Sequence, residues 1–316
     1  MRNTIELARL ADRLGYARYW IAEHHAIVSL ASPAPEIMIA RVGAETSGIR
    51  VGSGAVLLPH YSPLKVAETF RVLHALYPDR IDLGVGRAPG GTALEAWALR
   101  RDRERQQADD FGSQLVELIT WLEGTFPPDH PFSRIKISPA MPGAPEIWLL
   151  GSSLWSASAA AQLGLPYSFA HFIDPQPTRR AVEYYRSHFA AAESSGNPRV
   201  MLALGAICAE SEAEAARLLT SARLFRRRIR QGDIRPIPTP EEAIAELDPA
   251  PEMPPAADDE WPRYFAGRPE TVRDRLIDMA SVLNAEELMV VTIVHDHAAR
   301  MRSYELLAEA FGLTPR

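Results

Sequence analysis

The sequence has little that would place the protein in an oxidising compartment or in a membrane. Among its 316 residues only Cys208 is a cysteine, which excludes a disulfide framework within the chain and argues against a cysteine metal site. No apolar run approaches the roughly 20 residues that a membrane-spanning helix needs. No secretory signal precedes the first expected helix. A cytoplasmic location fits these absences best.

An excess of positive charge is also missing. The chain carries 34 Lys and Arg against 40 Asp and Glu, for a formal net charge of −6 at pH 7. Without a basic face we expect neither a nucleic acid nor an anionic membrane surface as a partner. The exception is the arginine-rich stretch 223–230. It is expected to be the solvated end of a helix, where cations complement the helix dipole.

What the sequence does contain is a repeated alternation of strands and helices, with 47% hydrophobic residues to form a large core. A helix is expected over residues 4–14. Two proline-rich stretches, at about 124–146 and 231–268, are expected to be irregular, and the second is interpreted as a lid. Seven strands, each followed by a helix, are expected at residues 19–22, 51–58, 80–86, 147–150, 167–169, 200–207 and 288–294.

This alternation predicts an α/β fold with parallel strands and right-handed crossovers, which leaves an open doubly wound sheet or a closed barrel. The leading helix has no strand before it. Seven units and that helix make eight units if one strand is missing ahead of Met1, and eight units close a (β/α)8 barrel. We therefore expect one barrel domain over residues 1–316, with irregular insertions at 124–146 and 231–268.

Small hydroxyl residues mark one junction between a strand and a helix. Gly151, Ser152 and Ser153 end the strand, and Ser156 lies in the first turn of the helix. Free backbone N–H groups, hydroxyls and the positive helix end suit an anion such as a phosphate. Arg87 on a neighbouring loop would add a charge-assisted donor. An ordinary serine N-cap is the simpler alternative.

Glycines and histidines mark further candidate positions. Residues 84–90 do not form a dinucleotide fingerprint, because the third glycine is one place late and Pro89 interrupts the helix start. Small residues there favour a flat ligand lying against the strand. His24 and His25 would face opposite ways on a continued strand, so at most one faces a pocket. No third ligand accompanies His295 and His297, so no metal site is predicted.

Four motifs together resemble the bacterial-luciferase-like family of flavin-dependent monooxygenases. They are residues 19–25 (YWIAEHH), 52–59 with 62–68, 80–87 and 160–166. The resemblance covers nearly the whole chain. It implies a (β/α)8 barrel whose first strand precedes the first helix.

The resemblance also implies roles for single residues. His24 occupies the position of the catalytic histidine. Gly54 and Ala55 match the place where the family holds a non-proline cis peptide against the flavin ring. The flavin phosphate site matches the loops that carry Arg87, Gly151, Ser152, Ser153 and Ser156.

The implied reaction uses O2 and reduced FMN (FMNH2), delivered by a separate flavin reductase. Through a C4a-peroxyflavin it oxygenates a small hydrophobic substrate, such as an aldehyde or an aromatic polyketide, and relatives suggest a homodimer. Light emission is not expected, because Gly86 replaces a cysteine of luciferase and Ser152 an acidic residue. Two alternatives remain: an F420-dependent oxidoreductase of the same superfamily, and a non-catalytic flavin-binding protein.

Overall fold

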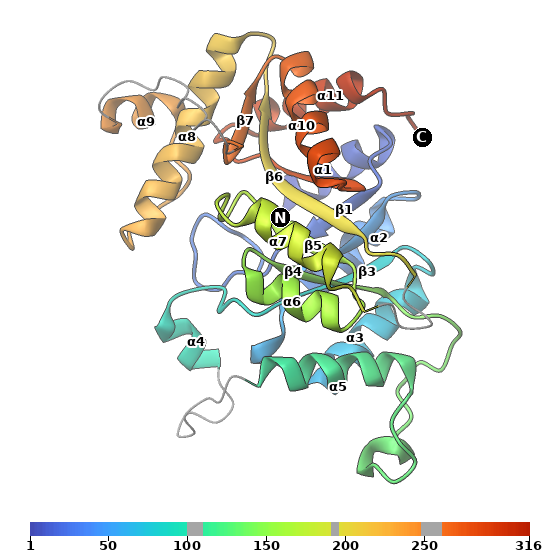
Figure 1. Ribbon diagram of the computed structural model, residues 1–316. Coiled ribbons are helices and arrows are strands. Elements are labelled where there is room, and N and C mark those ends of the chain that lie inside the picture. The colour runs from blue at the N-terminus through green and yellow to red at the C-terminus, as the bar shows by residue number, and fades with distance from the viewer. Residues whose placement is uncertain (100–109, 191–195, 248–260) are drawn as a thin grey trace. The chain divides into compact units, whose positions relative to one another are not determined.

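The computed structural model describes residues 1–99, 110–190, 196–247 and 261–316 (Figure 1). Its strands are β1 (Arg18–Ile21), β2 (Arg50–Leu57), β3 (Ile81–Gly86), β4 (Glu146–Gly151), β5 (Tyr167–Ala170), β6 (Val200–Cys208), β7 (Tyr264–Gly267) and β8 (Glu287–Val291). Its helices are α1 (Arg2–Arg13), α2 (Pro35–Glu45), α3 (Pro63–Leu76), α4 (Ala93–Leu99), α5 (Phe111–Glu123), α6 (Leu154–Gln162), α7 (Thr178–Ser187), α8 (Glu212–Arg230), α9 (Pro240–Glu246), α10 (Pro269–Leu283) and α11 (His297–Phe311).

Local chemistry explains where many of these helices begin and end. Proline occupies the first helical position of α2, α3, α9 and α10, where its missing N–H costs no hydrogen bond. Gly124 and Gly312 end α5 and α11 in the left-handed conformation, which glycine adopts without a steric penalty. No helix in the described part of the chain combines the length and the apolar character that crossing a bilayer requires.

The chain divides into two compact units. The first contains residue 1 and residues 17–26 and 31–150, and the second contains residues 2–16, 27–30 and 151–316. In the first unit β1 pairs with β2, β2 with β3, and β3 with β4. In the second unit β6 pairs with β5, β7 and β8. All of these pairs are parallel, which confirms the predicted α/β class with alternating helices.

Strand β7 is an element that the periodicity of the sequence did not reveal. It has only four residues and lies in the stretch 231–268, which also contains α9. Residues 206–208 of β6 extend beyond the part that pairs with β8, and with Gly205 they pair with Tyr264–Gly267. The central part of the expected lid, residues 248–260, lies outside the described residues. The single-domain boundaries and a strand ahead of Met1 remain predictions.

Two further expectations change in detail. After the strand at 80–86 the sequence predicts a helix from about residue 103 to 122; the structure has α5 from Phe111 with Asp110 as its N-cap, and the expected residues 103–109 lie outside the described ranges. The arginine-rich end of α8 was expected to be solvated, which is wrong for Arg228. That side chain is 3% exposed and pairs with Glu242 and Glu246 of α9 at 2.7 and 2.5 Å. A buried guanidinium needs such partners, since desolvation of an unpaired charge is costly.

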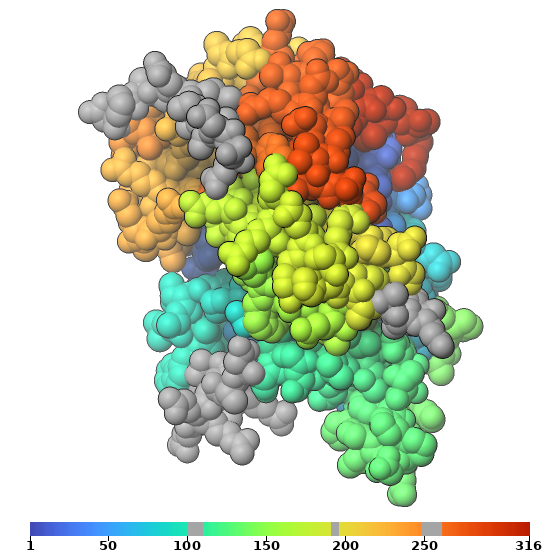
Figure 2. Space-filling model, in the orientation of Figure 1, coloured from blue at the N-terminus to red at the C-terminus, as the bar shows by residue number. Residues whose placement is uncertain are grey.

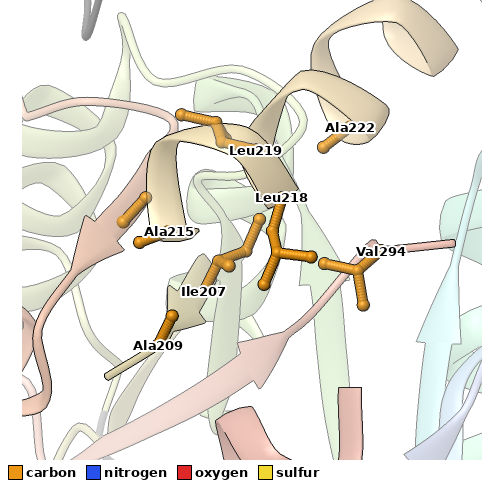
Figure 3. Packing of buried hydrophobic residues seen from close by; sticks show 8 residues of the cluster. Ile207, Ala209, Ala215, Leu218, Leu219, Ala222 and Val294 are labelled. Carbon is orange, nitrogen blue, oxygen red and sulfur yellow. The ribbon is translucent and has the colours of Figure 1, made fainter. Parts of the chain in front are cut away.

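A hydrophobic cluster fixes α8 on the strands of the second unit (Figure 3). Leu218 and Ala222 project from α8 toward Ile207 of β6 and toward Val294. Small residues such as Ala215 and Ala266 in this cluster allow the helix to approach β6 and β7 closely. The orientation of α8, and therefore of its arginines, is set by this packing.

A buried charge network fixes the amino ends of the strands in the first unit. The carboxylate of Asp82 on β3 is fully buried and accepts hydrogen bonds from Arg18 Nη1 at 2.8 Å, Trp20 Nε1 at 2.9 Å and Arg50 Nε at 2.9 Å. Arg18 also donates to Glu146 at 3.0 Å. These donors compensate the cost of burying the carboxylate. The network therefore holds the register of β1 to β4 at the edge opposite their carboxyl ends.

Candidate functional site

The carboxyl ends of β1, β2 and β3 lie at one edge of the sheet in the first unit. Ile21 pairs with Ser53, and Leu57 pairs with Gly86, so the segments that follow these strands meet at the same edge. Residues 23–25 follow β1, and Arg87 follows β3. Two of the predicted site segments are thereby placed at the same edge.

Glu23 is the central acceptor at this edge, and it is 2% exposed. Its Oε2 accepts the N–H of Leu57 at 3.0 Å, and its Oε1 accepts the hydroxyl of Tyr61 at 2.7 Å. His25 Nε2 lies 2.8 Å from the same Oε1. Because a carboxylate only accepts, this nitrogen carries the hydrogen. Three donors satisfy the buried carboxylate and join the loop after β1 to the end of β2.

His24 differs from His25 in having an unengaged ring. Its main-chain N–H donates to Ser32 O at 3.0 Å, while its half-buried ring makes no hydrogen bond within the part of the chain that the structure describes. Burial lowers the pKa of His24, with His25 adding to the effect and Glu23 opposing it. The imidazole is therefore neutral at pH 7 and can accept or donate a proton.

Tyr61 is held in its neutral form. Burial, followed by the hydrogen bond to Glu23 and its charge, raises the pKa of the Tyr61 hydroxyl. The phenol therefore remains a donor to Glu23 over the whole physiological pH range. This contact makes Tyr61 a support for the loop that carries His24.

The loop after β3 packs on the loop after β1. Gly90 O accepts the main-chain N–H of His25 at 2.9 Å. Gly90 has a φ of +67°, and a Cβ there would lie 2.1 Å from Leu57 Cδ1, so only glycine fits. His60 Nε2 lies 3.0 Å from Pro89 O, and the rings of His25 and His60 meet edge to face at 5.8 Å.

The peptide bond between Gly54 and Ala55 is cis, as the family resemblance implied. A Cβ on Gly86 would lie 3.2 Å from the Cβ of Ala55, so a side chain there would crowd this peptide. Glycine is required at position 84 for a different reason, because a Cβ there would lie 2.0 Å from Ser53 O. Close strand packing accounts for Gly84 without a ligand, whereas the role of Gly54 and Ala55 toward a flavin remains a prediction. Arg87, at the end of β3, is exposed.

The serine-rich turn belongs to the second unit and caps α6. Ser153 and Ser156 form a capping box, and Ser156 Oγ donates to Ser153 O at 2.7 Å. The hydroxyl of Tyr167 lies 2.9 Å from Ser156 Oγ, and a Cβ on Gly151 would lie 2.3 Å from that atom. Ser156 is thus buried and used inside the turn, while Ser153 is exposed and Ser152 half-buried.

The N-cap alternative therefore describes what the serines do within the protein. This N-cap does not occupy all donors of the turn, since the first N–H groups of a helix lack partners within that helix. Phosphate binding by the serine-rich turn and Arg87 remains a prediction.

Sequence reasoning did not assign roles to three residues of these networks: Glu23, Tyr61 and Tyr167. A signal existed for Glu23, because a carboxylate directly after an apolar strand is rarely buried without a purpose. Tyr61 and Tyr167 carried none, since their partners are identified only by the fold. Within the described ranges, no group of three or more His, Cys, Asp or Glu residues could hold a metal ion. His295 Nδ1 lies 2.8 Å from Ile237 O.

Comparison with known proteins agrees with the family resemblance of the sequence motifs. The chain matches the sequence profile of the luciferase-like monooxygenase family over residues 1–284. It is 44% identical to the uncharacterized protein YceB of Bacillus subtilis over 98% of this chain and 93% of YceB. It is 33% identical to the N-acetyl-S-alkylcysteine monooxygenase of the same organism, over 98% of this chain and 92% of that protein.

Solved structures show the same fold. The crystal structure of apo-MsnO8 matches with a TM-score of 0.91 and 54% identity, over 100% of this chain and 93% of the other. The oxygenating constituent of 3,6-diketocamphane monooxygenase from Pseudomonas putida, in complex with FMN, matches at 0.68 and 21%, over 97% and 91%. The coenzyme F420 dependent tetrahydromethanopterin reductase of Methanopyrus kandleri matches at 0.67 and 17%, over 99% and 96%. At these two lower identities the likeness concerns the (β/α)8 barrel fold alone.

Proposed function

Because this chain belongs to the luciferase-like monooxygenase family, we propose that it is a monooxygenase that uses reduced FMN and O2 to oxygenate a small hydrophobic substrate. The observation that carries this proposal is the neutral ring of His24, which makes no hydrogen bond to any described residue and lies beside a Glu23 with three donors. A proton carrier needs an accessible nitrogen and a fixed position, and the Glu23 network supplies the second requirement.

The side chains of the predicted cofactor-binding residues are chemically suited to bind a flavin. Gly54 and Ala55 within β2, and Gly86 at the end of β3, present no bulky side chain. We assign to Gly54 and Ala55 the contact with the flat ring. We assign the phosphate to Arg87 and to the turn Gly151, Ser152, Ser153 and Ser156, where a guanidinium, exposed hydroxyl and helix N–H groups match an oxyanion.

In this proposal bound FMNH2 would supply the chemistry with O2, and the protein would position the cofactor and exclude water from the site. His24 holds or moves a proton at its ring nitrogen. Glu23 and Tyr61 keep the loop of His24 in place, and Arg87 anchors the cofactor. A separate flavin reductase would deliver FMNH2, and we further propose a cytoplasmic homodimer.

An anaerobic titration tests the cofactor. The apoprotein should bind FMNH2 tightly and reduced F420 weakly, because the site residues are assigned by their resemblance to those of flavin-dependent monooxygenases. The F420-dependent alternative predicts the reverse order. The outcome separates two cofactors that the same fold accommodates.

A second experiment tests catalysis. Mixing the FMNH2 complex with O2 and candidate substrates, such as aldehydes and aromatic polyketides, should give O2 uptake coupled to product formation. His24→Ala should keep flavin affinity and release H2O2 in place of product, while the control His188→Gln, at an exposed histidine, should retain coupling. Tight binding of oxidised FMN with no substrate-stimulated O2 uptake would favour the non-catalytic alternative. Full activity of His24→Ala would remove this histidine from the mechanism.

A further inference from the structure

Two arginines of the second unit contact the segment that follows β5, and a third lies close enough to act on both of them electrostatically. Arg226 and Arg230 lie one turn apart on α8, and Arg263 lies immediately before β7. We call these three residues the arginine cluster. The helices α8 and α9 form part of the molecular surface, in gold and orange in Figure 2. The family resemblance and the proposed flavin site leave the cluster without a role.

Two of the guanidinium groups converge on one carbonyl. Ile173 O accepts a hydrogen bond from Arg226 Nη2 at 3.1 Å and another from Arg263 Nη1. Arg263 Nη1 also donates to Phe172 O at 2.9 Å. These bonds use one nitrogen of each guanidinium. The other guanidinium nitrogens of Arg226 and Arg263 make no hydrogen bond to another residue in the described ranges.

A buried histidine holds the backbone beneath the cluster through hydrogen bonds. His171 is fully buried, its Nδ1 lies 2.8 Å from Thr178 Oγ1, and its Nε2 lies 3.1 Å from Pro262 O. The imidazole thus joins the residue before Arg263 to the start of the segment that Arg226 and Arg263 share. Fixed positions of the donors lower the entropic cost of binding a ligand.

The cluster also lacks the counter-charges that other arginines of α8 have. Arg217 pairs with Glu214 and Glu241, and Arg228 pairs with Glu242 and Glu246. In the four described ranges none of the three cluster arginines forms an ion pair. Like charges at positions i and i+4 of a helix, as in Arg226 and Arg230, repel each other.

The electrostatic consequence is visible at Arg263. Burial first, and then the neighbouring charges of Arg226 and Arg230, lower the pKa of Arg263 to about 10. Asp174 acts in the opposite direction, but it is not within ion-pair distance of any cluster arginine in the described residues. A bound anion would relieve this repulsion.

We propose that the arginine cluster is a binding site for the oxyanion group, carboxylate or phosphoryl, of a small molecule. The planar fork of a guanidinium matches the oxygens of both groups, and charge-assisted bonds to them are the strong ones. The simpler interpretation is a solvated helix end. It does not explain why Arg226 and Arg263, from separate parts of the chain, both donate to Ile173 O. This site needs no flavin, so it stands or falls independently of the proposed oxygenase reaction.

Isothermal titration of the flavin-free chain with succinate and with inorganic phosphate, at constant ionic strength set by sodium chloride, tests the site. The phosphate titration is run in Arg87→Gln, because the proposed flavin phosphate site would also bind this probe. We expect saturable binding of at least one probe. Arg226→Gln and Arg263→Gln should each weaken it at least about tenfold, as expected for loss of a charge-assisted bond. The control Arg227→Gln, on the exposed side of the same helix, should leave it unchanged.

Absence of saturable binding with both probes overturns the proposal, and so does unchanged affinity in Arg226→Gln and Arg263→Gln. If Arg263→Gln disturbs folding, Arg230→Gln decides, because Arg230 makes no contact whose loss would unfold the described part of the protein. The sequence also places Asp258, Asp259 and Glu260 shortly before Arg263. Binding that occurs only after neutralising these three residues (D258N/D259N/E260Q) would assign the cluster to the chain's own carboxylates and overturn the proposal.

Discussion

The buried carboxylate of Glu23 accepts the hydroxyl hydrogen of Tyr61 across 2.7 Å, although the two residues are 38 positions apart in the chain. This contact joins the loop after β1 to the segment after β2. His24 therefore takes its position from its neighbour in the sequence, whose own position depends on another strand.

Replacing Glu23 by Gln tests this support. The amide keeps one oxygen and replaces the other by an NH2 group, which would face either the N–H of Leu57 or the donors of Tyr61 and His25, so we expect a loss of about 1 to 3 kcal/mol in the free energy of unfolding. Urea denaturation measures it. Glu123→Gln, at an exposed position on α5, should change stability by less than about 0.5 kcal/mol. Equal stabilities of the two variants would contradict the role assigned to Glu23.

Gly90→Ala probes the packing of the loop after β3. The new Cβ would collide with Leu57 Cδ1, and the φ of +67° disfavours a side chain. Gly124→Ala is the matched control, since its φ is +69° but no atom lies within 4 Å of the new Cβ. The control should cost about 1 kcal/mol for the backbone conformation, and Gly90→Ala should cost clearly more in the same thermal unfolding measurement. Similar costs would show that the loop moves away freely.

Asp82→Asn should be the most destabilising of these substitutions. It leaves the guanidiniums of Arg18 and Arg50 without their shared buried carboxylate, and breaking a buried ion pair in this way costs about 3 to 5 kcal/mol. Chemical denaturation measures the loss. Asp79→Asn, a nearby exposed residue with a φ of +61° that asparagine tolerates, should be close to neutral. A neutral Asp82→Asn would mean that Glu146 alone can compensate both arginines.

His171 predicts an acid-sensitive stability. Burial lowers its pKa to about 4 from a usual 6.5, so between these values the unfolded chain binds a proton that the folded chain does not. The free energy of unfolding should therefore fall as the pH decreases from 6.5 toward 4. The contribution of this residue at full effect is about 3 kcal/mol. His171→Gln should be less stable at pH 7 but show a shallower pH dependence over this window, measured by urea denaturation at several pH values. An unchanged slope would contradict the assignment.

Local patterns in the sequence were enough to predict the class of the fold and the candidate loops. Apolar periodicity is a local property, so it identified seven strands and the helices between them. It also placed residues 23–25, Gly54, Ala55, Arg87 and the serine turn at strand ends, where parallel folds bring their chemistry together.

Which of these groups already have hydrogen-bond partners depends on contacts between distant parts of the chain. The tertiary structure gave Glu23 its donors, turned His25 toward Glu23, left the ring of His24 without a hydrogen bond to the described residues, and used Ser156 for Tyr167. It paired the short β7 with the end of β6 and brought Arg263 to α8. Each of these outcomes joins residues whose contact depends on strand register and helix packing, and side-chain partners at such distances leave no periodic signal in the chain. Local propensity identifies the elements, whereas burial and the need to satisfy every buried polar group select the partners.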